Sequence, residues 1–279
     1  MKEKLEEQLA ALIKNKVCIA FSAGVDSTVL LYACCEAAKK EGIPLDHIAA
    51  VTFSTVLHPQ ADLQEAKEIT KQLHIRHEVL VVDELKNPKV IANGIDRCYH
   101  CKRAGFTAIV NHARSLGFPT VIDGSNASDR GDYRPGMRAA QELGVRSPLM
   151  EVGFTKDEER ELLRAWGYPV WNLPAGACLA TRVPTGEELT REKVDVIRTC
   201  EDYLHDLGLD QVRARLVGGC MHIEAAPADA AKIAALGSTA VNDEGKAPLP
   251  AAIESALRNL GCGHISPEVT PYIHGNMNQ

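Results

Sequence analysis

The sequence has no apolar run long enough to span a membrane and no apolar signal-peptide core near its N-terminus. It also has no excess of positive charge, since its formal net charge is −6. Bulk electrostatics therefore give no reason to expect a nucleic-acid partner. We expect a cytoplasmic protein without a membrane partner, whose nine cysteines are reduced or hold metal rather than form disulfides.

Short apolar runs alternate with helically spaced apolar residues in the first half of the chain. Strands are expected at residues 16–21, 47–53, 79–82 and 120–123, and helices at 28–40, 59–73 and 102–116. Such an alternation is typical of an α/β fold with a doubly wound parallel sheet.

The pattern changes after about residue 148. A helix at 153–166 precedes an irregular stretch at 168–186, and a further helix is expected at 190–207. Two strand-like runs, 212–217 and 221–225, and two more helical stretches follow. We expect a second, smaller α+β domain and divide the chain into residues 1–150 and 151–279, with the boundary somewhere within 145–186.

The segment Ser22-Ala23-Gly24-Val25-Asp26-Ser27 lies between the first strand and the first helix of the expected sheet. Small residues let a phosphate approach the backbone, and the N–H groups at a helix start hold an anion. The glycine patterns of Walker A loops and of dinucleotide folds are both absent here. A simple Ser/Gly turn with Asp26 as a helix cap is the local alternative.

This loop resembles the Ser-Gly-Gly-x-Asp-Ser pyrophosphate loop (PP-loop) of the N-type ATP pyrophosphatases. Ala23 replaces the first glycine, a small change if its φ is negative. The resemblance implies cleavage of ATP, with Mg²⁺, between the α- and β-phosphates. The implied ATP-binding residues are Ser22, Ala23, Gly24, Asp26, Ser27, Phe53 and Ser54. Asp26 is also a catalytic candidate. Phe53 and Ser54 are expected to contact adenine through their backbone.

A second loop, Asp123-Gly124-Ser125-Asn126, follows the fourth expected strand, where ligands of parallel sheets gather. Alone it reads as a turn. In pyrophosphate-loop enzymes a Gly-Thr/Ser-Asn element at this place faces the nucleotide, so Gly124 and Asn126 join the expected ATP site. Further polar residues follow closely: Asp129, Asp132, Tyr133 and Arg134.

Three cysteines are candidates for chemistry. Cys98-Tyr99-His100-Cys101 opens the helix at 102–116, and by itself a Cys-x-x-Cys indicates a redox pair, half a zinc site or cluster ligands. Cys178 has small neighbours, and Arg182 can favour its thiolate. Three converging thiolates suit an iron–sulfur cluster with one open iron.

The combined motifs resemble the LarE family over about residues 16–225. Besides the two loops, they are Cys-Tyr-His-Cys-Lys at 98–102, Asp-Tyr-Arg-Pro-Gly at 132–136, Val-Arg-Ser-Pro-Leu at 145–149 and Ala-Cys-Leu-Ala-Thr-Arg-Val-Pro-Thr-Gly at 177–186. LarE proteins are ATP-dependent sulfur transferases that make the nickel-pincer nucleotide of lactate racemase. The resemblance implies that pyridinium-3,5-biscarboxylic acid mononucleotide is adenylated on each carboxylate and that sulfur then displaces AMP.

The family has two sulfur sources. One subset sacrifices a single cysteine at the position of Cys178, and another binds a [4Fe-4S] cluster that carries a sulfide from a donor. Because Cys98 and Cys101 accompany Cys178, the resemblance favours the cluster form, with all three as cluster ligands and Cys178 as a catalytic residue. Family members also tend to form homo-oligomers.

Arg213 and Arg215 alternate along the expected strand 212–217 and so share one face. Paired guanidiniums suit a phosphate, and the resemblance assigns them to the phosphate of the substrate. From spacing alone, two surface arginines are nearly as good a description. Glu201 and Glu224 are further candidates for a metal or substrate contact.

Three other functions remain open. A tRNA thiolase shares the pyrophosphate loop and can use three cysteines, but the acidic charge and the lack of paired zinc knuckles argue against it. An amide-forming ligase of the NAD synthetase kind does not need three thiolates. A nucleotide-binding sensor without catalysis would release no pyrophosphate.

Overall fold

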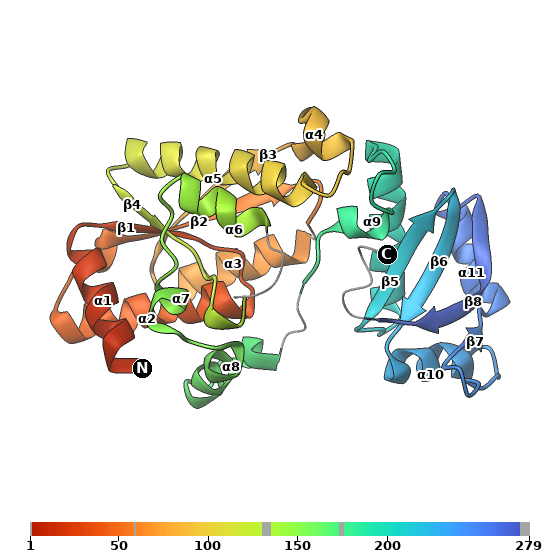
Figure 1. Ribbon diagram of the computed structural model, residues 1–279. Coiled ribbons are helices and arrows are strands. Elements are labelled where there is room, and N and C mark those ends of the chain that lie inside the picture. The colour runs from red at the N-terminus through yellow and green to blue at the C-terminus, as the bar shows by residue number, and fades with distance from the viewer. Residues whose placement is uncertain (1, 59, 130–134, 173–175, 274–279) are drawn as a thin grey trace. The chain divides into compact units, whose positions relative to one another are not determined.

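The computed structural model describes residues 2–58, 60–129, 135–172 and 176–273. The chain forms two compact units (Figure 1). The first combines Met1–Glu84 with Asp96–Gly176, and the second combines Leu85–Ile95 with Ala177–Gln279. Each unit has its own four-stranded sheet.

The sheet of the first unit is parallel, in the order β3-β2-β1-β4. Its strands are β1 (Val17–Ala20), β2 (Ile48–Thr55), β3 (Arg76–Val82) and β4 (Thr120–Ile122). All four strands were expected from the sequence, and the parallel α/β sheet is confirmed. Strand β4 lies on the opposite side of β1 from β2. The direction in which successive strands are added to the sheet therefore reverses between β1 and β4.

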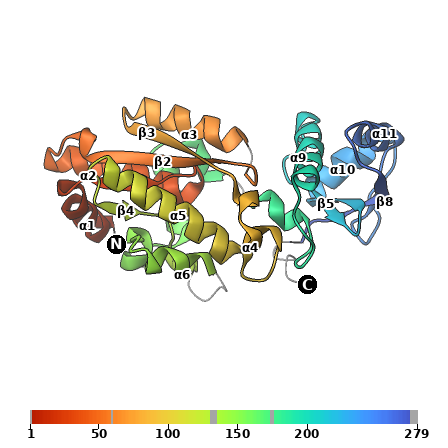
Figure 2. The same ribbon diagram turned by 90° about the horizontal axis from the view of Figure 1, so that it is seen from above.

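Helices cover both faces of this sheet (Figures 1 and 2). They are α1 (Lys2–Lys14), α2 (Val25–Glu41), α3 (Gln60–Gln72), α5 (Arg97–Ser115), α6 (Pro135–Glu142), α7 (Pro148–Val152) and α8 (Lys156–Ala165). Alternate side chains of β1 separate two cores: Val17 and Ile19 pack with α1, α2 and α8, whereas Cys18 packs with α5. A sheet with apolar side chains on both faces is the doubly wound arrangement.

The first unit extends beyond residue 150, where the sequence analysis divided the chain. Helix α8 packs against α2 and buries Leu163 in the core below the sheet. The unit therefore continues to Gly176. Helices α6 and α7 were not expected, and α5 begins at Arg97, so the Cys-x-x-Cys lies inside its first turn rather than before it.

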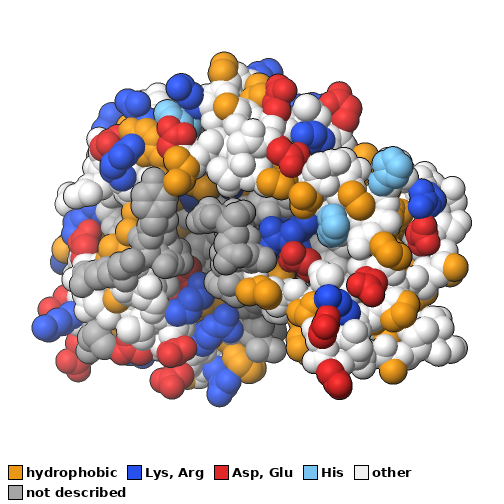
Figure 3. Space-filling view, turned by 45° about the vertical axis from the view of Figure 1, so that its right-hand side comes forward, with side chains coloured by type: hydrophobic (Ala, Val, Ile, Leu, Met, Phe, Trp, Pro, Cys, Tyr) orange, Lys and Arg blue, Asp and Glu red, His pale blue; other side chains and the backbone are white. Residues whose placement is uncertain are grey.

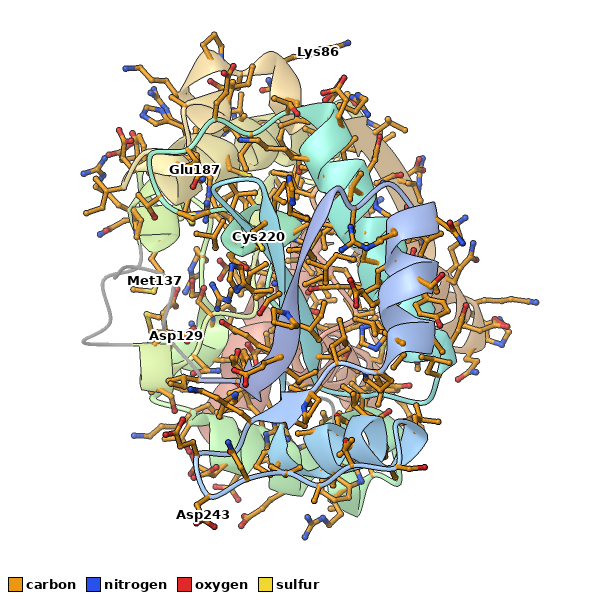
Figure 4. The ribbon with its side chains drawn as sticks, turned by 90° about the vertical axis from the view of Figure 1, so that its right-hand side faces the viewer. Lys86, Asp129, Met137, Glu187, Cys220 and Asp243 are labelled. Atoms are coloured by element: carbon orange, nitrogen blue, oxygen red, sulfur yellow. The ribbon has the colours of Figure 1, made fainter. Side chains whose placement is uncertain are left out.

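The second unit has a mixed sheet in the order β5-β6-β8-β7. Its elements are α4 (Pro88–Ile91), α9 (Arg191–Asp206), β5 (Val212–Val217), β6 (Cys220–Ala225), α10 (Pro227–Leu236), β7 (Ala247–Pro248), α11 (Ala251–Asn259) and β8 (His264–Pro271). Figure 4 labels Cys220 at the start of β6. Strands β7 and β8 were missed because three prolines interrupt their pattern.

The short segment Leu85–Ile95 belongs to the second unit although it is far from it in sequence. Buried Asn93 donates from its side chain to the carbonyl oxygens of Val183 and Pro184, at 3.3 and 2.8 Å. Short 3₁₀ helices complete the structure at Leu45–His47, Glu84–Lys86, Ala127–Asp129, Pro169–Asn172 and Leu179–Arg182.

No helix in the described ranges is both long and apolar enough to cross a membrane. Acidic and basic side chains are interspersed on the face drawn in Figure 3.

Candidate active site

A cavity of about 320 Å³ lies in the first unit at the carboxyl ends of the parallel strands. Seven of the expected ATP-binding residues line it: Ser22, Gly24, Asp26, Ser27, Phe53, Ser54 and Gly124. They come from the loop after β1, the first turn of α2, the end of β2 and the loop after β4, around the place where the chain changes direction across the sheet. Ligands of open α/β sheets bind at such a switch point, and the volume is in the range of small-molecule sites.

The phosphate loop closes on itself through hydroxyl groups. Oγ of Ser27 accepts a hydrogen bond from the backbone N–H of Ser22 and donates to the carbonyl oxygen of Gly24, both at 3.2 Å. Gly24 is the N-cap of α2, and no side chain caps this helix. The alternative with Asp26 as cap is therefore wrong, and the N–H groups of the first helical turn have no intrahelical acceptors, so that they are able to bind an anion.

Ala23 does not have the negative φ that the sequence analysis required. Its φ is 59°, in the left-handed region, and its side chain is buried. The backbone keeps the turn that a glycine makes easily, at a cost of about 1 kcal/mol for a residue with a Cβ. The shape of the loop is thus maintained by the surrounding structure rather than by the residue at this position.

The two loops are in direct backbone contact. A Cβ on Gly124 would lie 2.7 Å from the backbone nitrogen of Ser27 and 2.8 Å from the carbonyl carbon of Asp26. Asp123 accepts hydrogen bonds from Oγ of Ser147, at 2.6 Å, and from Oγ of Ser125, at 3.0 Å. Ser147 comes directly after Arg146, which forms an isolated parallel β-bridge with Ile122 of β4. The sequence analysis did not assign Ser147 to the site.

Asn126 does not line the cavity, in contrast to the expectation. It is fully buried, its Nδ2 donates to Oε2 of Glu159 at 3.2 Å, and its Oδ1 accepts from the backbone N–H of Ser128 at 3.0 Å. Asn126 therefore holds the loop in place from behind, while Gly124 and Ser125 face the cavity. The other residues noted after this loop, Asp132, Tyr133 and Arg134, lie outside the described residues.

Helix α8 contributes two ionisable residues, Lys156 and Glu159, that the sequence analysis missed. A capping box of Thr155 and Glu158 fixes the helix start. Nζ of Lys156 then lies 2.8 Å from Oδ1 and 3.1 Å from Oδ2 of Asp26. Burial, followed by the Asp26 carboxyl, raises the pKa of Glu159 to about 9, so this side chain is neutral at physiological pH. The Thr-x-x-Glu pattern at 155–158 was the available sequence signal for the helix start.

The end of the cavity beside β2 and β3 is more apolar. The ring of Phe53 packs against Gly105 of α5, where a Cβ would lie 2.9 Å from it. Glu84 also lines the cavity, and burial raises the pKa of its carboxyl above its usual value. Cys101 and Lys102 line the same cavity from the first turns of α5.

The three candidate cysteines are divided between the two units. Cys98 is exposed and Cys101 is partly buried, one turn apart on α5, while Cys178 is partly buried in the second unit. None of the nine cysteines forms a disulfide. Within either unit, the described residues contain no group of three acidic, histidine or cysteine side chains arranged as metal ligands. By their chemistry, cysteine thiolates are the donors that iron–sulfur clusters take.

Arg182 has a partner that the sequence analysis did not assign to it. Its guanidinium is buried and forms a two-pronged ion pair with Glu201, at 2.8 and 2.9 Å. Its remaining group donates to the carbonyl oxygens of Ala177 and Cys178, at 3.1 and 3.3 Å. Arg182 thus fixes the backbone that carries Cys178, and Glu201 is the partner of its buried charge.

Arg213 and Arg215 lie on one face of β5, as their spacing predicted. Nε of Arg215 is 2.7 Å from Oε2 of Glu224, on the neighbouring strand. The guanidinium of Arg213 lies 5.3 Å from the ring centroid of Tyr272, and burial, then the nearby Arg182, lowers its pKa. Both arginines are partly buried rather than loose on the surface.

Comparison with known proteins agrees with this geometry. Residues 1–133 match the family described as a PP-loop domain. An uncharacterized protein of Synechocystis is 38% identical over 213 residues, 76% of this chain and 77% of that protein. An argininosuccinate synthase of Natronomonas pharaonis is 29% identical over 167 residues, 56% of this chain and 40% of that protein.

A characterised relative extends beyond the nucleotide domain. The pyridinium-3,5-bisthiocarboxylic acid mononucleotide synthase of Lactiplantibacillus plantarum is 30% identical over 218 residues, which cover 77% of both chains. This match, together with the phosphate loop and its cavity, places the protein among ATP-using enzymes. The chain belongs to the LarE family within the PP-loop superfamily.

Proposed function

We propose that this protein is an ATP-dependent sulfur transferase that converts the two carboxylates of pyridinium-3,5-biscarboxylic acid mononucleotide into thiocarboxylates. The observation that carries the proposal is the phosphate-loop cavity in a chain that is 30% identical to a synthase named for the thiocarboxylate product. The same proposal includes the biosynthesis of the nickel-pincer nucleotide and a homo-oligomeric assembly, both by family resemblance.

The first unit would activate the substrate. Backbone N–H groups of the loop from Ser22 to Ser27 bind the departing phosphates of MgATP, whose metal ion is held by the phosphate oxygens. The backbone near Phe53 and Ser54 holds adenine. A substrate carboxylate oxygen attacks the α-phosphorus, pyrophosphate leaves, and an acyl-adenylate remains. Since a carboxylate is a poor electrophile and AMP is a good leaving group, a sulfur nucleophile then attacks the acyl carbon and releases AMP.

The second unit would bind the substrate, and cysteines of both units would take part in sulfur delivery. Arg213 and Arg215 bind the substrate phosphate as paired guanidiniums. Cys98, Cys101 and Cys178 would hold a [4Fe-4S] cluster, which when bound supplies sulfide to the acyl carbon through its open iron. In the alternative form, Cys178 gives its own sulfur once and becomes dehydroalanine.

The test uses anaerobically purified protein with MgATP, sulfide and the pyridinium mononucleotide. We expect pyrophosphate and AMP in equal amounts and a product in which each carboxylate has exchanged one oxygen for sulfur, read by mass spectrometry. Cys178→Ala should abolish the sulfur product, and Cys220→Ala, a partly buried cysteine of the same unit, should not. Formation of an amide with ammonia, or thiolation of tRNA instead of the mononucleotide, would overturn the proposal.

Iron analysis separates the two sulfur sources. About four irons per chain, lost in Cys98→Ala, Cys101→Ala and Cys178→Ala, would support the cluster. If wild-type protein stays free of iron after reconstitution and Cys178 is lighter by one hydrogen sulfide after turnover, the cysteine is the sacrificial donor.

A further inference from the structure

Glu159 is a carboxylic acid without exposed surface, close to the phosphate loop. Carboxylates are almost never fully buried unless they are paired. Oε2 of Glu159 accepts a hydrogen bond from Nδ2 of Asn126 at 3.2 Å. Its Oε1 is buried and meets no donor among the described residues. Hydrogen-bond donation by Asn126 alone satisfies only half of this carboxyl group.

Among the described residues, the carboxyl of Asp26 also lies within hydrogen-bonding reach of Glu159. Two carboxylates cannot bond to each other, so one of the pair must carry a proton. Asp26 forms an ion pair with the Lys156 ammonium, at 2.8 Å. Glu159 is the more buried of the two carboxyl groups, which assigns the proton to Glu159.

The charged and polar groups around this pair come from three elements. Asp26 comes from α2, Lys156 from α8, and Asn126 from the loop after β4, whose backbone N–H also donates to Asp129. Lys156 and Glu159 are three residues apart on α8 and therefore share a face. Asp26 is thus held from two directions, by an ammonium and by an acid proton.

We propose that Glu159 is a neutral positioning residue that donates its proton to Asp26 and so fixes this carboxylate at the phosphate loop for MgATP. An ionised Glu159 would instead place a second negative charge behind a loop that must accept a triphosphate. The raised pKa of Glu159 is consistent with this arrangement. The proposal rests only on the ATP-binding part of the proposed function and not on sulfur transfer.

The test measures the dissociation constant of MgATP by calorimetry between about pH 6 and pH 10 for wild type and three variants. Glu159→Gln keeps a neutral donor of the same size, and Glu159→Leu keeps the volume without a donor. Glu161→Gln, on the exposed side of the same helix, is the matched control. Circular dichroism at each pH verifies that every variant is folded.

We expect Glu159→Gln to bind MgATP within about threefold of wild type near pH 7, because the amide replaces the acid as donor. Wild type and Glu161→Gln should lose affinity about tenfold more than Glu159→Gln between pH 8 and 10. Glu159→Leu should bind about tenfold more weakly than wild type near pH 7 and, like Glu159→Gln, should lack the extra loss of affinity between pH 8 and 10.

Two results would overturn the inference: equal pH profiles of wild type and Glu159→Gln, or wild-type affinity in a folded Glu159→Leu. If wild type does not bind MgATP at all, the ATP-using function fails and the inference fails with it. If MgATP binds as described but no thiocarboxylate forms, only the sulfur-transfer proposal is lost.

Discussion

Ala23 occupies the left-handed region of the backbone, with φ at 59°, in the loop that faces the cavity. A glycine at this place has no Cβ to strain, although it loses more entropy on folding. We expect Ala23→Gly to raise the free energy of unfolding by about 0.5 kcal/mol, measured by urea denaturation. Ala104→Gly, at an exposed position inside α5, should lower it by about 1 kcal/mol. A destabilised Ala23→Gly would show that the native angle at this residue is negative.

Glu159 makes the stability of the protein depend on pH. The folded state raises its pKa from 4.5 to about 9, so the folded protein binds this proton more tightly than the unfolded chain. The contribution is complete below about pH 4.5 and is lost as pH rises toward about 9. The unfolding free energy of wild type should therefore decline across this window, and we expect Glu159→Gln to reduce the decline by about 2 kcal/mol. The reduction is smaller than the full pKa shift would give because the pair with Asp26 can relax.

Urea denaturation at a series of pH values measures this slope. Glu161→Gln, which changes an exposed carboxylate of the same helix, should keep the wild-type slope. Identical slopes for wild type and Glu159→Gln would contradict a neutral, buried Glu159.

At the scale of elements, the contact between the two cavity loops requires a residue without a Cβ at position 124. The backbone of Gly124 lies against the start of α2, and a Cβ there would overlap main-chain atoms of Asp26 and Ser27. Main chain cannot move aside as a flexible side chain can, so the loop or the helix must shift. We expect Gly124→Ala to cost about 1–3 kcal/mol of stability and to weaken MgATP binding at least tenfold.

The same substitution at Gly24 is the control for stability. Its φ is −70°, and an added Cβ would come no closer than 3.5 Å to Oγ of Ser22. Gly24→Ala should therefore unfold within about 0.5 kcal/mol of wild type. Equal stability of both alanine variants would mean that the two loops are not in contact.

At the scale of the whole molecule, the chain has two compact units with separate sheets, and the ATP cavity belongs to only one of them. Each unit has its own hydrogen-bonded sheet and buried side chains, so we expect two transitions in scanning calorimetry. MgATP at about 100 times its dissociation constant should stabilise the transition of the first unit by about 2.7 kcal/mol and leave the other unchanged.

A substitution at Glu201 is expected to destabilise the second unit and leave the first unchanged. Its carboxylate pairs with buried Arg182 and accepts a hydrogen bond from the backbone of Ala214, both within the second unit. Glu201→Ala leaves that guanidinium uncompensated and should lower the second transition by about 3–5 kcal/mol without moving the one that MgATP raises. A single transition that responds to both changes would show that the units unfold together.

The sequence by itself determined the architecture of the first unit and the position of its phosphate loop. Apolar runs with helical segments between them define β1, β2 and β4, because a largely buried strand must be mostly apolar. Only the apolar second half of the edge strand β3, residues 79–82, followed from the same pattern. Small residues directly after β1 identify the phosphate loop, since backbone that contacts an anion leaves no room for side chains. The shared face of Arg213 and Arg215 followed from strand alternation alone.

Only the tertiary structure decided which polar groups meet. Lys156 and Glu159 reach Asp26 across 130 and 133 positions of the chain, and no local pattern encodes such a pairing. The same holds for Arg182, which pairs with Glu201, and for Asn126, which binds Glu159 behind the loop. Local periodicity reports which face of an element is buried, whereas the partners and protonation of buried charges depend on what the rest of the fold brings against that face.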